Sequence, residues 1–439
     1  MHPEAAPRES TGPTELLRSR RYVGLLLLAA VLGVPISAVA YGFLFLVNHV
    51  QQWVYDDLPS SVGFPAAPTW WPIPVLLVSG FLTGLAIRWL PGRGGHSPAG
   101  GFKPGLPEPV ELPGVAAAAL AGLGLGVVLG PEAPLIAIGG GLAVWAVRLS
   151  RRDLPHQAMA VVGAAGAFAA ISTLLGSPLV GAFLLMEMAG IAGPMLGVVM
   201  VPGLLAAGVG SLIFIGLGQW TGLGTFSLAI PDLAAVAAPD LPQFGWAIVI
   251  GIAAALLGTG LRRGALAIQK RAERRVVTYA TVAGGGIALL AVAYAAATGR
   301  GPQDVLFSGQ DALGPLLTQN QTYAVGTLLL LIVGKGAAYA FALATFRGGP
   351  IFPSMFIGAA GGIALAHLPG LDPIQGAAMG IGAMCTVLLK FPLTAILLTT
   401  LFLGADGITV MPLAIVAVVV AYVASAWLSR PSTAPRAPD

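Results

Sequence analysis

Apolar segments follow one another along almost the whole chain, and glycine or proline interrupts most of them. The 439 residues include 61 glycines and 35 prolines, and only 9% are charged, against about 25% in an ordinary soluble domain. Several segments are shorter than the roughly 20 residues that a perpendicular membrane span needs. Because unpaired backbone groups are costly in lipid, broken helices are tolerated only inside a protein or along a watery path. The sequence therefore predicts an all-α polytopic membrane protein with a channel or transporter core.

The basic residues gather in short loops between these apolar segments. Loops of this kind stay on the cytoplasmic side, so we expect a cytoplasmic N-terminus and a multi-pass protein of the plasma (cell inner) membrane, surrounded by lipid. These loops account for the net charge of +4, which therefore does not indicate a nucleic-acid partner. The basic groups are Arg18, Arg20 and Arg21; Arg148, Arg151 and Arg152; Arg262 and Arg263; and Lys270, Arg271, Arg274 and Arg275.

Cysteine usage and motif content exclude several function classes. Cys385 is the only cysteine, which excludes an internal disulfide and a multi-thiolate metal site. The sequence has no Walker A motif, and we predict neither a cofactor nor a metal. The first apolar run, residues 22–47, is too long for the core of a signal peptide, so we expect it to remain as a helix.

The composition divides the chain into two apolar halves. The segment between them carries three prolines, Pro231, Pro239 and Pro242, and two of these have an aspartate beside them. We predict five regions: a disordered cytoplasmic tail (1–21), a first membrane repeat (22–220), an inter-repeat linker (221–243), a second membrane repeat (244–429) and a short C-terminal tail (430–439).

The two halves resemble each other in sequence. Residues 130–139 and residues 349–358 have the same amino acid at five of ten positions, including the first glycine and both prolines. Further along, Ser177-Pro178-Leu179-Val180 matches Phe391-Pro392-Leu393-Thr394 at a similar offset. A weaker pair is Gly92-Arg93-Gly94 with Gly299-Arg300-Gly301. Paired interrupted segments at corresponding positions predict a binding site near the middle of the membrane.

Glu132 stands where the first of these repeated motifs predicts the start of a helix. Pro131 suits the first turn, in which its missing N–H is not needed. The free N–H groups and the positive end of the helix dipole attract anions there. The Glu132 carboxylate is then a tethered anion with which a dissolved anion must compete, and a proton removes that competition. We predict that Glu132 is a gate and a proton acceptor, and that the second motif begins a similar helix at Ile351 and Phe352 without an acid.

These motifs resemble those of the CLC family of chloride channels and proton/chloride exchangers. Residues 130–134 are similar to its Gly-Lys/Arg-Glu-Gly-Pro motif, residues 348–353 to Gly-Gly-x-Phe-x-Pro, and residues 94–98 loosely to Gly-Ser-Gly-Ile-Pro. The resemblance implies an inverted-repeat fold of short, tilted and broken helices, a homodimer, and an anion path in each subunit with Glu132 as its external gate. The path residues it implies are Gly95, His96, Ser97, Gly130, Pro131, Ala133, Gly349, Ile351 and Phe352.

The chain departs from the family pattern at the anion site. The family's anion-binding serine corresponds to Gly95, and we consider Ser97, two residues further on, as its replacement. Pro350 occupies one of the two positions whose backbone N–H groups the family uses, and proline has none. Ile351 and Phe352 remain as donors. The family's anion-facing tyrosine near the C-terminus has no counterpart, because Tyr422 lies earlier, in an apolar helix where we expect ordinary packing.

A second departure concerns proton coupling. Exchangers of the family often carry a Glu-Glu pair whose second acid takes up protons from inside, and here the pair is Glu187-Met188. We name both positions as the inner proton path. The missing second acid argues for weak coupling. Glu187 has an alternative role as a structural acid, paired with a base such as Lys390.

Several functions remain open from the sequence. The protein is a passive anion channel or a proton/anion exchanger, with chloride and protons as expected partners and fluoride, nitrate or bicarbonate as alternatives. A second hypothesis is an inverted-repeat transporter for another solute. A third is an intramembrane enzyme built on His96, Ser97 and Glu132, but the chain has no His-Glu-x-x-His and no Gly-x-Ser-x-Gly motif. We predict that it is not an enzyme.

Overall fold

The computed structural model describes residues 15–429 apart from residues 16, 103–104, 106, 151–154, 191–192, 194, 222–229, 231–232 and 234–235. In this part of the chain all regular structure is helical, as predicted. The helices are α2 (Arg20–Gln52), α3 (Leu58–Ser61), α4 (Pro72–Trp89), α5 (Leu112–Leu123), α6 (Glu132–Leu149), α7 (His156–Leu175), α8 (Pro178–Ala189), α9 (Met195–Thr221), α10 (Leu241–Ala272), α11 (Val276–Thr298), α12 (Gln310–Thr318), α13 (Val325–Thr345), α14 (Ile351–Leu365), α15 (Pro373–Leu389), α16 (Pro392–Phe402) and α17 (Gly407–Leu428).

Nine helical stretches in the described residues are long and apolar enough to cross a membrane. Five other apolar helical stretches, those ending in α5, α8, α14, α15 and α16, are shorter than 18 residues. Large apolar side chains cover the outer faces of the long helices: Val31 is 67% exposed, Leu212 70% and Trp427 86%. Apolar residues exposed over so large a surface indicate contact with lipid or with another subunit. The predicted polytopic membrane protein is confirmed in these terms.

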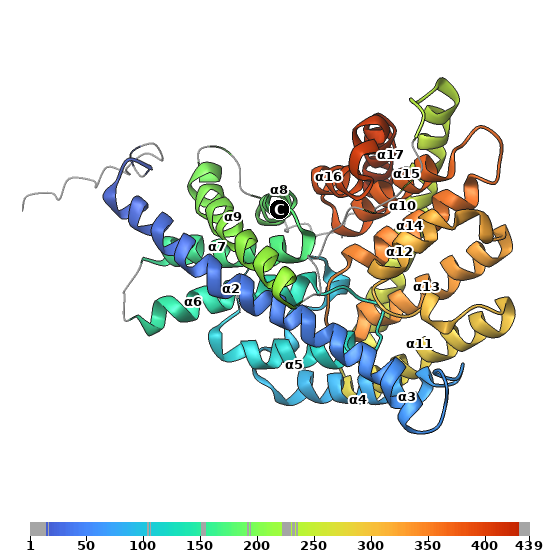
Figure 1. Ribbon diagram of the computed structural model, residues 1–439, viewed down its shortest axis with the longest axis horizontal. Helices are drawn as coiled ribbons and strands as arrows, with labels where there is room; N and C mark the ends of the chain where they lie inside the picture. The colour runs from blue at the N-terminus through green and yellow to red at the C-terminus, as the bar shows by residue number, and fades with distance from the viewer. Residues whose placement is uncertain are drawn as a thin grey trace, which may run out of the picture.

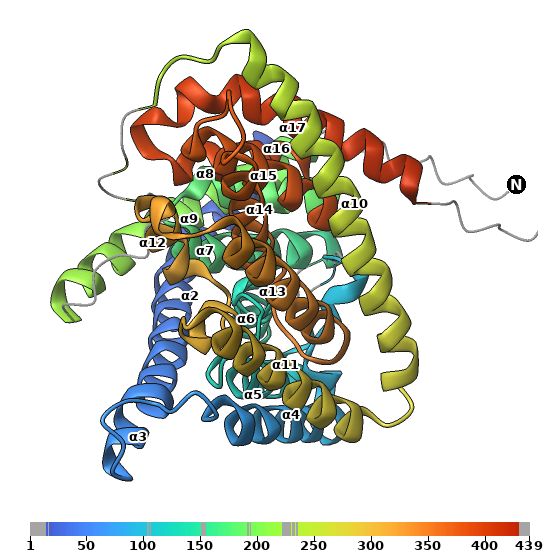
Figure 2. The same ribbon diagram turned by 90° about the vertical axis from the view of Figure 1, so that its right-hand side faces the viewer.

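The chain folds into two halves that lie side by side, α2–α9 and α10–α17 (Figure 1). Contacts between the halves include α4 of the first half, which packs on α11 of the second, and α8, which packs on α16. Figure 2 shows α10 running along one edge of the second half, with α13, α14 and α15 beside it. The predicted linker 221–243 and both predicted tails lie largely outside the described residues, so the division into these regions stays a prediction.

Two helices too short to count as membrane spans, α14 and α15, are the most deeply buried. Every residue of α15 from Ile374 to Leu389 is buried, as are 13 residues of α14. Both sequences are apolar on all sides, which is the pattern of a helix without a solvent face. Because α6 and α14 begin inside the protein, their first turns present backbone N–H groups to the interior.

Glycines let α14 and α15 approach backbone to backbone. Gly358 faces Gly380, and Gly362 faces Gly376, so closely that a Cβ atom on any of the four would overlap the opposite backbone. Small residues at a helix crossing allow such packing in membrane proteins. The crossing fixes the position of α14, whose first turn forms part of the site described below.

We predict that Gly362→Ala lowers the thermal stability of the purified protein in detergent, by about 1–3 kcal/mol, because the new methyl group meets the Gly376 backbone. Gly361→Ala is the matched control, since nothing lies within 4 Å of a Cβ at that position. Equal melting temperatures for the two variants would contradict the described helix crossing.

Candidate functional site

The broken starts of α6 and α14 meet at a pair of backbone hydrogen bonds. The Gly130 N–H donates to the Gly349 carbonyl at 2.8 Å, and the Gly349 N–H donates to the Gly130 carbonyl at 2.5 Å. Among the described residues this antiparallel bridge is the one place where extended backbone pairs. It joins the two repeated motifs directly, 219 residues apart. The starts of two helices, one from each half, are thereby held next to each other.

Glu132 lies at this junction as the first residue of α6. Its side chain is fully buried, and its Oε1 atom accepts a hydrogen bond of 3.1 Å from the Phe352 N–H at the start of α14. The Oε2 atom has no hydrogen-bond partner among the described residues. A carboxylate of the first half thus occupies the N-terminal end of a helix in the second half, where anions bind favourably.

Gly130 and Gly349 form the walls around this carboxylate. A Cβ atom at either position would overlap the carboxyl oxygens of Glu132. The glycines are therefore needed for space, because a side chain there would push the carboxylate out. This explains physically why both repeated motifs carry glycine at this place.

Three side chains that the sequence analysis did not select support the start of α14. The Tyr339 hydroxyl and the Ser354 hydroxyl both donate to the Pro350 carbonyl at 2.9 Å. The Cys385 thiol lies 3.4 Å from the Ser354 hydroxyl. All three side chains are fully buried. In the sequence, a tyrosine and a serine within apolar helices could have indicated these contacts, although neither residue has a counterpart in the first repeat.

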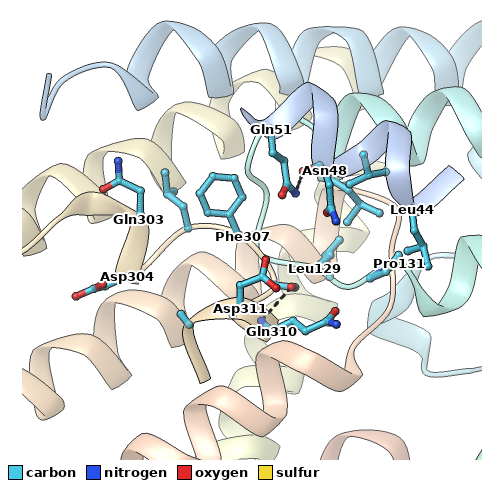
Figure 3. A pocket seen from close by; sticks show the side chains of 16 residues that line it. Leu44, Asn48, Gln51, Leu129, Pro131, Gln303, Asp304, Phe307, Gln310 and Asp311 are labelled. Atoms are coloured by element: carbon cyan, nitrogen blue, oxygen red, sulfur yellow. Dashed lines mark hydrogen bonds between the residues drawn. The ribbon is translucent and has the colours of Figure 1, made fainter. Parts of the chain in front are cut away.

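A cavity of about 300 Å³ reaches the junction from one side. Leu129 and Pro131 line it, so it ends next to Glu132. Figure 3 shows Asn48 and Gln51 of α2 on the opposite wall from Gln310. These residues of α2 lie near its C-terminal end, far from the basic residues at its N-terminus. If those basic residues face the cytoplasm, the cavity opens outside, and we call it the outer cavity.

A second cavity, of about 50 Å³, lies on the other side of the junction. Ser97 and Arg347 line it together with the ends of α10 and α13. Arg347 precedes Gly349 by two residues, so this inner cavity also lies close to the bridge. Lys335, near the middle of α13, binds a loop that lines the outer cavity. The inner cavity begins about 15 Å further along the same helix. Burial lowers the pKa of Arg347 to about 10, so its guanidinium remains a cation at neutral pH.

Lys335 is a fully buried lysine on α13. Its Nζ atom donates to the carbonyls of four consecutive residues, 304–307, at 2.8–3.4 Å and lies 4.6 Å from the centre of the Phe356 ring. An ammonium has three N–H donors and no acceptor. A set of four carbonyl oxygens therefore offers every one of its donors a partner. The loop that Lys335 holds forms one wall of the outer cavity. An ionisable residue inside an apolar helix was a signal that the sequence analysis did not use.

The structure places the predicted path residues in two groups. Gly130, Pro131, Glu132 and Ala133 meet Gly349, Ile351 and Phe352 at the junction, as the repeated motifs suggest. The loop of Gly95, His96 and Ser97 lies instead at the inner cavity. There the Gly95 carbonyl accepts a hydrogen bond from Arg347 Nε at 3.1 Å, the His96 side chain is exposed, and the Ser97 hydroxyl faces the cavity.

Glu187 has a different partner from the one considered above. Its carboxylate accepts hydrogen bonds from the Leu393 N–H, the Thr394 N–H and the Thr394 hydroxyl at 3.0, 2.8 and 2.6 Å. The pairing with Lys390 is therefore wrong, and Lys390 donates to the Ser425 hydroxyl instead. Glu187 caps the N-terminus of α16, which lies in the other half of the chain. Met188 is half-buried against the apolar core beside it.

Comparisons with known proteins agree on one family. Residues 100–426 match the family described as voltage-gated chloride channels. The chain is 31% identical over 385 residues to YfeO of Salmonella paratyphi A and of Salmonella typhimurium, whose name proposes a role in ion transport. The alignment covers 84% of this chain and 88% of each relative.

Solved structures share the fold at low sequence identity. A slow cyanobacterial Cl⁻/H⁺ antiporter superposes with a TM-score of 0.75 at 21% identity, covering 93% of this chain and 95% of that one. A CLC-type fluoride/proton antiporter superposes with a TM-score of 0.68 at 22% identity, covering 92% and 95%. Both similarities show that this chain has the same inverted arrangement of helices.

We predict that Lys335→Met lowers the melting temperature of the purified protein more than any surface substitution. The variant leaves the carbonyls of residues 304–307 without their donor, and each unsatisfied buried group costs about 1–3 kcal/mol. Lys270→Met, at an exposed lysine, is the control. If both variants melt at the wild-type temperature, Lys335 does not hold this loop.

We predict that Glu187→Gln destabilises the protein by about 1 kcal/mol, because an amide has one carbonyl oxygen where the carboxylate offers two to the N-terminus of α16. The pH dependence of anion flux should stay as in the wild type. A changed pH profile at unchanged melting temperature would instead place Glu187 on a proton path.

Proposed function

The chain belongs to the family of voltage-gated chloride channels, and from this premise we propose that it carries chloride or a similar small anion across the membrane on a path closed by Glu132. The predicted family, fold and transport function are confirmed at this level, while the gating role remains a proposal. One observation carries this proposal. The fully buried Glu132 carboxylate lies between the two cavities and accepts a hydrogen bond from the Phe352 N–H. An anion that passes the junction must compete for that donor.

The proposed gate works by exchange of one anion for another. In the closed state the carboxylate of Glu132 receives the hydrogen bond from Phe352, and the starts of α6 and α14 stabilise its negative charge. A proton on Glu132 removes the charge and weakens the carboxyl group as an acceptor. The Phe352 N–H and the Ile351 N–H then become available to a dissolved anion, in a site shielded from water. Anions need no side-chain cation at this point, because backbone donors suffice.

Protonation of Glu132 can also couple anion transport to proton transport. If the proton that binds Glu132 arrives from one side of the membrane and leaves to the other, the protein exchanges protons for anions. The position at which related exchangers carry a second inner acid is Met188, which cannot bind a proton. Glu187 is engaged in capping α16. These features favour a channel or a weakly coupled exchanger over a tightly coupled one.

The two other hypotheses find less support. Family membership leaves little room for an inverted-repeat transporter of an unrelated solute. The enzyme hypothesis needed His96 and Ser97 beside Glu132, but these residues lie in the loop at the inner cavity. Among the described residues no group of three or more His, Cys, Asp or Glu side chains forms a metal site.

Assembly and membrane are proposed on family grounds. We infer a homodimer in the plasma (cell inner) membrane of the cell, with lipid around its outer faces. Leu179 of α8 and Leu393 of α16, on two helices that pack on each other, are 62% and 48% exposed. Exposed apolar residues on two contacting helices, one from each half, fit an interface between two subunits. Cross-linking in native membranes tests this part of the proposal.

We predict that Glu132→Gln abolishes the pH dependence of chloride flux into liposomes. In the wild type flux rises as pH falls, because protonation neutralises the gate. The glutamine side chain is neutral at every pH, so flux should be high and equal at pH 4.5 and 7.5. Glu187→Gln is the matched control, because it also replaces a carboxylate by an amide but should keep the wild-type pH dependence. Identical pH profiles of wild type and Glu132→Gln would refute the gate.

We predict that a pH gradient drives little or no uphill chloride movement in liposomes that contain the wild-type protein. Chloride accumulation and proton movement are recorded together with a chloride electrode and a pH dye. Stoichiometric uphill transport would show tight coupling and would require an inner proton acceptor other than Met188.

A further inference from the structure

Helices α10, α15 and α17 of the second half pack on one another (Figure 2). A Cβ atom on Gly258 of α10 would overlap the side chain of Val387 on α15, so these two helices are in contact there. Arg262 lies one turn beyond Gly258, and Lys390 lies three residues beyond Val387, at the end of α15. The Lys390 Nζ atom donates to the Ser425 hydroxyl of α17 at 2.8 Å. The three helices thereby bring two cations together.

Neither of these cations forms an ion pair within the described residues. The Arg262 side chain is half-buried, and its Nε atom is buried without a hydrogen-bond partner. Lys390 is half-buried as well, and burial together with the positive charge of Arg262 lowers its pKa. The carboxylate of Glu187 reaches the start of α16 but is occupied by backbone N–H groups there. Two half-buried positive charges therefore lie close together without a counter-charge from this part of the chain.

This pair lies where the surface of α10 changes from apolar to basic. The large apolar side chains that α10 exposes end at Leu257. From Arg262 to the last residue of α10, the charged side chains with high exposure are all cations: Arg263, Lys270 and Arg271. A helix of 32 residues is about 48 Å long, whereas the hydrocarbon core of a bilayer is about 30 Å thick. The change in chemistry therefore marks the level of the lipid headgroups, on the side that the sequence predicts to be cytoplasmic.

Two ordinary roles account for part of this arrangement. Lys390 ends α15, and Arg263 donates to the Leu428 carbonyl at the end of α17. Cations are favourable at the C-terminus of a helix, and basic residues beside membrane spans fix the orientation of the chain. Neither role requires Arg262 to be half-buried beside Lys390, because an exposed arginine would fix the orientation equally well. A buried donor without a partner costs about 1–3 kcal/mol, so the Arg262 Nε–H calls for a ligand.

We propose that Arg262 and Lys390, with Arg263 at the rim, bind the phosphate group of an anionic phospholipid in the cytoplasmic leaflet. Guanidinium and ammonium groups bind phosphate oxygens through charge-assisted hydrogen bonds. The Arg262 Nε–H is free, and Lys390 keeps two of its three N–H donors. Basic pockets between helices on the cytoplasmic side are suited to lipid headgroups. The exposed Leu257 side chain, five residues before Arg262, offers the acyl chains a surface that free phosphate would not use.

The site includes no residue of the Glu132 junction, so the proposal stands or falls independently of the gate. The test is lipid binding to the purified full-length protein in detergent, measured by native mass spectrometry with phosphatidylglycerol and with zwitterionic phosphatidylcholine. We expect the wild type to prefer phosphatidylglycerol. Arg262→Gln should weaken phosphatidylglycerol binding about tenfold, the factor for losing a hydrogen bond between charged groups. Lys390→Gln should weaken it in the same way, whereas Arg262→Lys keeps the charge and should lose less.

Arg271→Gln is the matched control. Arg271 is exposed on the same helix and donates to the Ala267 carbonyl one turn earlier, at 3.2 Å, so this variant loses one cation outside the site. It should bind phosphatidylglycerol like the wild type. An equal loss of affinity in Arg271→Gln and Arg262→Gln would show a general attraction to the basic surface and would overturn the proposed site.

Melting temperatures separate lipid binding from a structural role. Without lipid, Arg262→Gln should melt at or above the wild-type temperature, because it removes one of two neighbouring half-buried charges. A lower melting temperature with unchanged lipid affinity would make Arg262 a structural residue and refute the proposal. Equal binding of both lipids by the wild type would also refute it. Inorganic phosphate should not stabilise the wild type, and stabilisation equal to that by phosphatidylglycerol would assign the site to free phosphate instead.

Discussion

The pair of hydrogen bonds between Gly130 and Gly349 is the constraint on which the site depends. It places the first turns of α6 and α14 side by side, and only glycine leaves space there for the Glu132 carboxylate. The dipoles and free N–H groups of two helices then converge on one point inside the protein. Neither half of the chain can build this point alone, because each contributes one helix start and one strand of the bridge.

The first half also supplies acids to the second. Glu132 accepts from the start of α14, and Glu187 accepts from the start of α16. The two contacts have the same chemistry but different surroundings. Glu187 has three donors, which satisfy it as a cap, whereas Glu132 has one described donor and an oxygen left without a partner. The number of hydrogen bonds therefore distinguishes the two acids: Glu187 holds two helices together, whereas Glu132 can be displaced.

Much of this could be predicted from the sequence, for reasons that are physical. Glycines and prolines that interrupt short apolar segments are incompatible with simple anchors, and Pro131 before Glu132 indicates a helix that begins at an acid. The partners of side chains were harder to predict. Lys390 is near Leu393 in sequence, yet the α15–α16 turn directs it to Ser425, and Glu187 meets backbone donors that no sequence pattern marks. Lys335 contacts a loop about 30 residues earlier in the chain, and Tyr339 contacts the start of the next helix; only the fold brings these partners together.

The ligation of Lys335 has a consequence for how the protein is made. Moving a lysine to the middle of a bilayer costs about 2.5–3.5 kcal/mol on insertion scales. The carbonyls that solvate its charge belong to the loop before α12, which leaves the ribosome before α13 does. Membrane integration of α13 is therefore favoured once that loop has docked against Lys335. During biogenesis of the second half, the helix and the loop then enter the membrane together.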